Sequence, residues 1–126
     1  MNDMADRTMS GAELKVILTG LGLTPAWLAD QLHVTSRTIL RWMDDAAVPG
    51  KAVAAIEAVC EVTDKEIEKI TQTARIAGVL YTRRTDDEGV AECNTLPATW
   101  HRHAAFRALN DLRNGDTPVK VEYAIA

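Results

Sequence analysis

Two arginines, Arg37 and Arg41, are the side chains whose type and spacing best suit the recognition of a base edge or a phosphate. Residues four apart share one face of a helix. The stretch HVTSRTILRWM around them has helical periodicity, with apolar anchors at Ile39 and Trp42. If these anchors are buried, both arginines face outward. A guanidinium binds two acceptor atoms at once, so this face suits guanine or phosphate.

Cys93, His101 and His103 are the other side chains that could bind a ligand, in their case a metal ion. Histidines two apart on a helix point about 200° apart, so they cannot easily share one ion. We therefore expect no metal site, and we interpret His101 as a hydrogen-bonded interior or interface histidine. The sequence has no phosphate-binding glycine loop, nucleophile elbow or paired-histidine signature, so we expect no catalytic residue, no cofactor and no enzyme.

Composition agrees with a small folded protein. The 126 residues are 47% apolar and 25% charged, and the formal net charge is -4. The acidic balance argues against a histone-like binder of nucleic acid, although the distribution of charge matters more than the total. No apolar run approaches the length of a membrane span and no signal peptide is visible, so we expect a cytoplasmic protein without membrane contact.

Residues 1–9 are expected to form a flexible tail, and residues 10–77 a helical domain. Local signals predict five short helices in this domain, because capping residues and glycine or proline breaks recur along it. The predicted starts lie at Ser10, at Thr24 before Pro25, at Thr35, after Pro49 and Gly50, and at Thr63 with Glu66. The second and third of these helices are joined by a short turn at His33 and Val34.

This pair of helices meets the steric demands of a helix-turn-helix. The first helix has a small residue, Ala29, where the two helices cross, and Val34 fills the turn. The second helix would lie in the major groove, with Arg37 as the strongest candidate base reader. Amide groups at both helix starts suit phosphates. The candidate DNA-binding residues are Thr24, Ala26, Thr35, Ser36, Arg37, Thr38, Leu40 and Arg41.

The run LGLTPAWLADQLHVTSRTILRWMDD resembles the Cro/CI/Xre type of helix-turn-helix. Residues that match its pattern include Leu28, Ala29, Thr38, Ile39 and Trp42. Two residues depart from it. Pro25 occupies a position where many relatives carry a phosphate-binding glutamine. His33 replaces the usual glycine of the turn, and a histidine can adopt the positive φ of that glycine only at a steric cost.

Residues 78–126 read as a strand, a helix and a strand. VLYTRR is prone to form a strand, ATWHRHAAFRALNDLR is helical, and PVKVEYAI alternates. Two strands are too few to stand alone, so we expect two chains to pair their small sheets. The candidate dimerisation residues are Trp100, Phe106, Val119, Val121, Tyr123 and Ile125. We interpret Arg83 and Arg84, followed by acidic residues, as a solvated loop with local ion pairs; auxiliary phosphate contact is the alternative.

The whole layout, with YTRRTDDE and WHRHAAFRAL in the last third, resembles the anti-CRISPR-associated repressors and their actinobacterial or phage relatives. This resemblance implies a mainly α fold with a small strand-helix-strand dimerisation element. It also implies a homodimeric autorepressor that binds double-stranded DNA at an inverted repeat. An antitoxin-like module that binds a partner protein, an adaptor that does not bind DNA, and RNA binding by the same basic face remain as alternatives.

Overall fold

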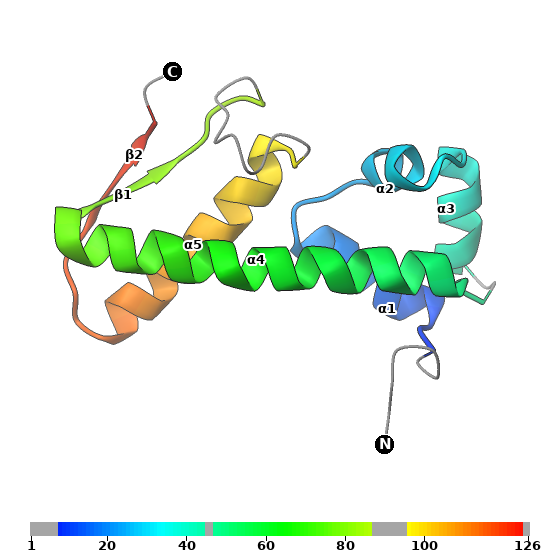
Figure 1. Ribbon diagram of the computed structural model, residues 1–126, viewed down its shortest axis with the longest axis horizontal. Coiled ribbons are helices and arrows are strands. Elements are labelled where there is room, and N and C mark those ends of the chain that lie inside the picture. Colours follow the sequence, from blue (N-terminus) through cyan, green and yellow to red (C-terminus); the bar gives the residue numbers. More distant parts are fainter. Residues whose placement is uncertain (1–7, 45–46, 87–95, 125–126) are drawn as a thin grey trace. The chain divides into compact units, whose positions relative to one another are not determined.

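The computed structural model describes residues 8–44, 47–86 and 96–124 (Figure 1). Within these ranges it contains five helices and one two-stranded sheet, which confirms a mainly helical fold. The elements are α1 (Gly11–Gly20), α2 (Pro25–Leu32), α3 (Ser36–Asp44), α4 (Gly50–Ala77), β1 (Val79–Thr82), α5 (Ala98–Asn114) and β2 (Lys120–Tyr123). None of the described helices is long and apolar enough to cross a membrane.

The chain forms two compact units, Met1–Glu61 and Val62–Ala126. The division lies inside α4, whereas the boundary expected from the sequence lies after it, between residues 77 and 78. We refer to these parts as unit 1 and unit 2.

Side-chain caps start the first three helices of unit 1, as predicted. The hydroxyl of Ser10 accepts a hydrogen bond from the amide of Glu13 at 3.0 Å. Thr24 caps α2 in the same way, through the amide of Trp27 at 3.1 Å, and Pro25 is the first helical residue. The hydroxyl of Thr35 accepts from the amide of Thr38 at 3.2 Å, just before α3. Each cap satisfies an amide that has no partner within its helix.

The core of unit 1 comes from the apolar stripes of these helices and of the first half of α4. Each stripe repeats at intervals of three and four residues, so its members share one face. The buried side chains include Leu14, Leu18, Leu28, Ile39, Trp42, Val53 and Ile56.

The prediction of separate fourth and fifth helices is wrong, because α4 runs without a break from Gly50 to Ala77. Thr63, the predicted cap between them, is fully buried inside this helix. Its hydroxyl accepts a hydrogen bond from the indole Nε1 of Trp100 at 2.8 Å. No glycine or proline interrupts residues 51–77, so nothing in the backbone forces the helix to end at the threonine.

Unit 2 contains a β-α-β arrangement in which β1 and β2 are parallel neighbours (Figure 1). Leu80 lies beside Val121 and Thr82 beside Tyr123 in the register of the sheet. α5 connects the two strands and packs on β1. Apolar residues of α4, β1 and α5 form one core cluster: Ile67, Ile70, Ala74, Leu80, Ala104, Ala105, Ala108 and Leu112.

His101 ties three elements of unit 2 together, which confirms the prediction of a hydrogen-bonded interior histidine. Its Nδ1 lies 3.0 Å from the hydroxyl of Thr82 on β1. Its Nε2 lies 3.2 Å from a carboxylate oxygen of Glu66 on α4. All three side chains are buried, so the network fixes β1 against both helices.

The prediction of a solvated loop is wrong for Arg83, whose side chain is only 1% exposed. Its Nη2 donates to the carbonyl oxygen of Leu96 at 2.7 Å and to that of Pro97 at 3.3 Å. Asp86 also has a structural role, because its carboxylate accepts from the first amide of α5, that of Ala98, at 2.7 Å. Arg84 is exposed, as predicted, and its guanidinium lies 4.5 Å from the ring centre of Tyr123.

Candidate nucleic-acid interface

The turn between α2 and α3 is closed by a left-handed residue. His33 has φ 58° and ψ 44°, so it takes the left-handed conformation of the usual glycine despite the steric cost expected for a side chain there. The amide of His33 donates to Asp30 at 3.4 Å, and the amide of Val34 donates to Ala29 at 3.0 Å. These bonds satisfy the last carbonyls of α2 and turn the chain sharply toward Thr35.

α3 divides into a buried stripe and an exposed face, as the sequence predicts. Ile39 is fully buried and Trp42 is 8% exposed, so both are committed to the core of unit 1. The opposite face carries the exposed residues Ser36, Arg37, Leu40, Arg41 and Asp44. We call this set the α3 face. Both of its basic residues point to solvent, and no acidic residue lies in the first turn of α3.

The first residue of α1 holds the other end of α3. Gly11 lies so close to the last turn of α3 that a Cβ atom built on it would be 2.5 Å from the carbonyl oxygen of Met43. α1 and α3 are in contact, and so are α2 and α3. The α3 face is therefore presented by a helix that is fixed at both ends.

The predicted phosphate-binding amides lie at exposed helix starts. Thr24, Ala26, Thr35 and Ser36 are all exposed. The caps engage the amides of Trp27 and Thr38, and helix geometry leaves the amides of Ala26 and Ser36 without an acceptor in their own helices. Thr38 is less available, because it is half-buried and its hydroxyl lies 3.0 Å from that of Thr35.

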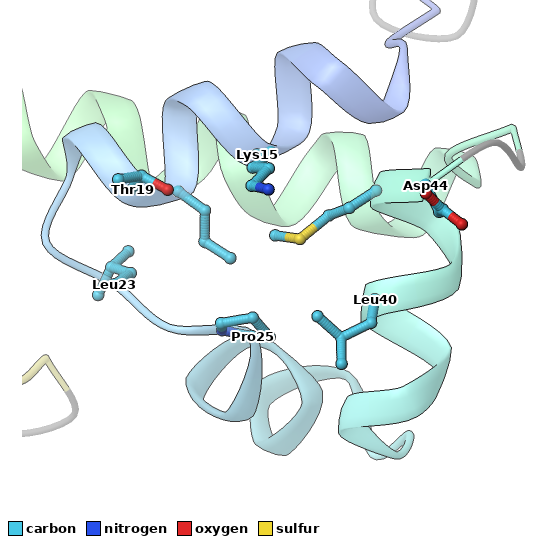
Figure 2. A pocket seen from close by; sticks show the side chains of 8 residues that line it. Lys15, Thr19, Leu23, Pro25, Leu40 and Asp44 are labelled. Carbon is cyan, nitrogen blue, oxygen red and sulfur yellow. The ribbon is translucent and has the colours of Figure 1, made fainter.

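A hollow of about 440 Å³ adjoins the α3 face (Figure 2). Leu40 and Asp44 line it from α3, Lys15 and Thr19 from α1, and Pro25 from the start of α2. Leu40 is 54% exposed and so belongs to both the hollow and the α3 face. The hollow shows that the surface beside the arginines is concave and largely apolar.

Lys15 is a basic group of this surface that the sequence analysis did not single out. It is exposed on α1 and lines the hollow, next to the exposed α3 face. Nothing in the periodicity of α1 distinguishes Lys15 from the other polar positions of that helix, so only the packing of α1 against α3 identifies it. Asp30 is the one acidic residue of the sequence between positions 24 and 43.

The candidate dimerisation residues do not share one environment. Trp100 is fully buried inside unit 2 and donates to Thr63, which corrects the expectation that its side chain offers surface to a second chain. Phe106 is 58% exposed on α5. Val119 packs partly against the core cluster, while Val121 and Tyr123 are 46% and 49% exposed on β2. Ile125 lies outside the described residues.

No group of three histidine, cysteine or acidic side chains that could hold a metal ion occurs in residues 8–44, 47–86 and 96–124. Cys93, one of the three ligands considered from the sequence, lies outside these ranges.

No protein-family model matches the chain, and no curated protein matches it either.

Proposed function

We propose that the protein is a sequence-specific DNA-binding transcriptional repressor with a helix-turn-helix of the Xre type. In this proposal it acts as a homodimer on an inverted repeat in its own promoter. The observation that carries the proposal is the division of α3, in which Ile39 and Trp42 are buried while Ser36, Arg37 and Arg41 are exposed on one face. A helix of about 10 to 12 Å diameter fits the major groove of B-form DNA, which is about 12 Å wide.

Arg37 is the proposed base reader. It is the second residue of α3, and the residues near the start of a recognition helix are those that reach base edges. Its guanidinium would donate to O6 and N7 of a guanine, which is worth about 1 to 3 kcal/mol of discrimination. The exposed methyl groups of Leu40 would contact a thymine methyl.

Arg41, Lys15 and the helix starts at Ala26 and Ser36 would contact the sugar-phosphate backbone. The amides attract phosphate without adding formal charge, so a protein with a net charge of -4 can still bind DNA at this surface. These contacts would fix the orientation of α3, and the base contacts would select the sequence.

The homodimer would place two copies of α3 in successive major grooves, about 34 Å apart. Such a complex covers a promoter and excludes RNA polymerase, which would produce repression without any catalytic step.

Selection of bound fragments from random duplex DNA tests this function. We expect an inverted repeat with a guanine in each half-site. Replacing Arg37 with alanine should lower the preference for that guanine by about 5- to 150-fold per half-site, as measured by competition between the selected and substituted duplexes. Arg113→Ala, which removes an exposed arginine at the end of α5, is the matched control and should leave the preference unchanged.

Two results would contradict the proposal. An Arg37→Ala protein with unchanged preference would show that this residue does not read bases. Equal competition by single-stranded or duplex RNA would show that the basic face recognises phosphates rather than a DNA sequence.

A further inference from the structure

β2 is a strand whose outer edge lies open. All four of its residues are exposed, and within the described part of the chain β1 is the only strand that pairs with it. A two-stranded sheet is marginal in water, and an open edge is a template for pairing with another chain. The side chains of Val121 and Tyr123, beside this edge, are apolar and about half exposed.

The hydrogen bonds of β2 show which residues face its open edge. The amide of Lys120 donates to Gly78 at 3.1 Å, and the amide of Ala124 donates to Thr82 at 2.8 Å. Because backbone groups alternate along a strand, the even-numbered residues bond to β1. The amides and carbonyls of Val119, Val121 and Tyr123 therefore point toward the open edge.

The charges of β2 distinguish between the possible symmetric pairings with a second strand of the same sequence. A two-fold axis at Lys120 or at Glu122 would place like charges directly opposite each other, which is unfavourable. An axis at Val119 would pair Val121 with Thr117 of the partner subunit, but the amide of Thr117 already donates to the carbonyl oxygen of Leu112 at 2.9 Å and so cannot extend the ladder. An axis at Val121 places Lys120 opposite Glu122 of the partner subunit, and Glu122 opposite Lys120 of the partner subunit.

We infer that β2 pairs antiparallel with β2 of a second copy of this chain, about a two-fold axis at Val121. The two Val121 residues then form a hydrogen-bonded pair, and Val119 and Tyr123 form one on either side of it. These are the three positions whose backbone groups point to the open edge. The oppositely charged residues fall at the non-hydrogen-bonded positions, where facing side chains are closest.

The inner face of the paired strands is complementary as well. Val119, Val121 and Tyr123 share the face that β2 turns toward the core cluster, because Leu80 and Thr82 are their buried neighbours in β1. In the pairing, the Tyr123 ring lies opposite Val119 of the partner subunit, an aromatic and β-branched pair that favours sheet association. The result is a four-stranded sheet with the order β1, β2, β2, β1.

This inference deepens the proposed function by specifying its dimer contact. Its support lies entirely in unit 2, so DNA binding and dimerisation can succeed or fail separately. All of the following measurements use the full chain without DNA.

Disulfide cross-linking tests the register. In a background with Cys60→Ser and Cys93→Ser, Val121→Cys should give an oxidised dimer on a non-reducing gel. The two Cα atoms of a hydrogen-bonded pair lie about 5.5 Å apart, which suits a disulfide. Tyr123→Cys is the matched control: its two copies would lie about 14 Å apart and should stay uncross-linked. Cross-linking through residue 123 instead of 121 would overturn the proposed register.

Charge reversal tests the same pairing by sedimentation velocity. Lys120→Glu and Glu122→Lys each replace two attractive cross-strand pairs by two repulsive ones, and each should raise the dimer dissociation constant about tenfold or more. The double variant exchanges the two charges and should restore the original value. Weakening by both single variants without recovery in the double variant would contradict the pairing.

A proline scan separates dimerisation from folding. Val121→Pro removes an amide that points to the open edge, so it should abolish the dimer while the far-ultraviolet circular dichroism of the protein is unchanged. Glu122→Pro removes an amide that points to β1 and should destabilise the protomer. A Val121→Pro protein that remains a dimer, or an unsubstituted protein that is a monomer at high micromolar concentration, would refute the inference.

Discussion

Gly11 shows how one residue outside the α3 face controls its position. The start of α1 and the last turn of α3 approach each other so closely that no side chain fits between them. Because a protein interior is densely packed, an added methyl group there can be accommodated only by a shift of one helix. Such a shift would move the α3 face without changing any residue on it.

Gly11→Ala should therefore lower the free energy of unfolding by about 1 to 3 kcal/mol, the usual range for overpacking. Chemical denaturation measures this effect. Gly20→Ala is the matched control on the same helix, since its added Cβ would meet nothing within 4 Å and alanine favours the helix. Equal destabilisation by both substitutions would show that the close approach of α1 to α3 is not the reason why a side chain at position 11 destabilises the protein.

Among the helices and strands, α4 is the main departure from the sequence-based expectation. Thr63 and Glu66 match a capping box, yet both lie buried inside one continuous helix. The indole of Trp100 and the imidazole of His101 hold these two side chains from α5. The two polar side chains that the local sequence pattern assigns to a helix start therefore make hydrogen bonds to another helix instead.

Asp64→Pro distinguishes the two arrangements. In a continuous helix this residue lies in the interior, where proline removes a backbone hydrogen bond and costs about 3 kcal/mol or more. After a cap at Thr63 it would occupy the first helical position, where proline is well tolerated. We expect a large loss of unfolding free energy in urea. Asp64→Ala is the control, and its free energy of unfolding should stay within about 0.5 kcal/mol of that of the unsubstituted protein. If the proline variant is as stable as the alanine variant, the continuous helix is disproved.

The same contrast explains how much the sequence could reveal. The caps at Ser10, Thr24 and Thr35 were predictable because donor and acceptor lie within three residues of each other. The exposed α3 face was also predictable, since one buried stripe determines the rest of a short helix. The burial of Arg83 was not, because its acceptors at Leu96 and Pro97 lie beyond a polar segment. The role of Lys15 was not predictable either, because it depends on the packing of α1 beside α3 and not on the local sequence.

For the proposed function, the acidic balance of the protein limits how strongly it can bind DNA as a whole. Only a few basic residues accompany the α3 face, and Lys15 and Arg41 are those that we assign to phosphates. Non-specific binding should accordingly be weak, because it depends on the number of phosphates that cations neutralise. Sequence selection would then rest on base contacts more than on overall attraction.

The salt dependence of operator binding measures this property. Two phosphates neutralised by cationic side chains in each of two protomers predict a slope of about -4 in a plot of log K against log salt concentration. Arg41→Ala should reduce the magnitude of this slope by about 2, because each of its two copies neutralises one phosphate. Fluorescence anisotropy of a labelled operator gives both values. A slope of about -10 would mean that the protein makes many more phosphate contacts than Lys15 and Arg41 supply.

The parallel pairing of β1 with β2 also determines the order of folding and dimerisation. Val79 and Lys120 are neighbours in the sheet although α5 and its connections separate them in the chain. Contacts of such long sequence separation form slowly, because the intervening chain must close first. The open edge of β2 comes into existence only when that closure is complete. Two copies could therefore meet there only as folded monomers, and refolding should show a step that is independent of protein concentration before one that depends on it.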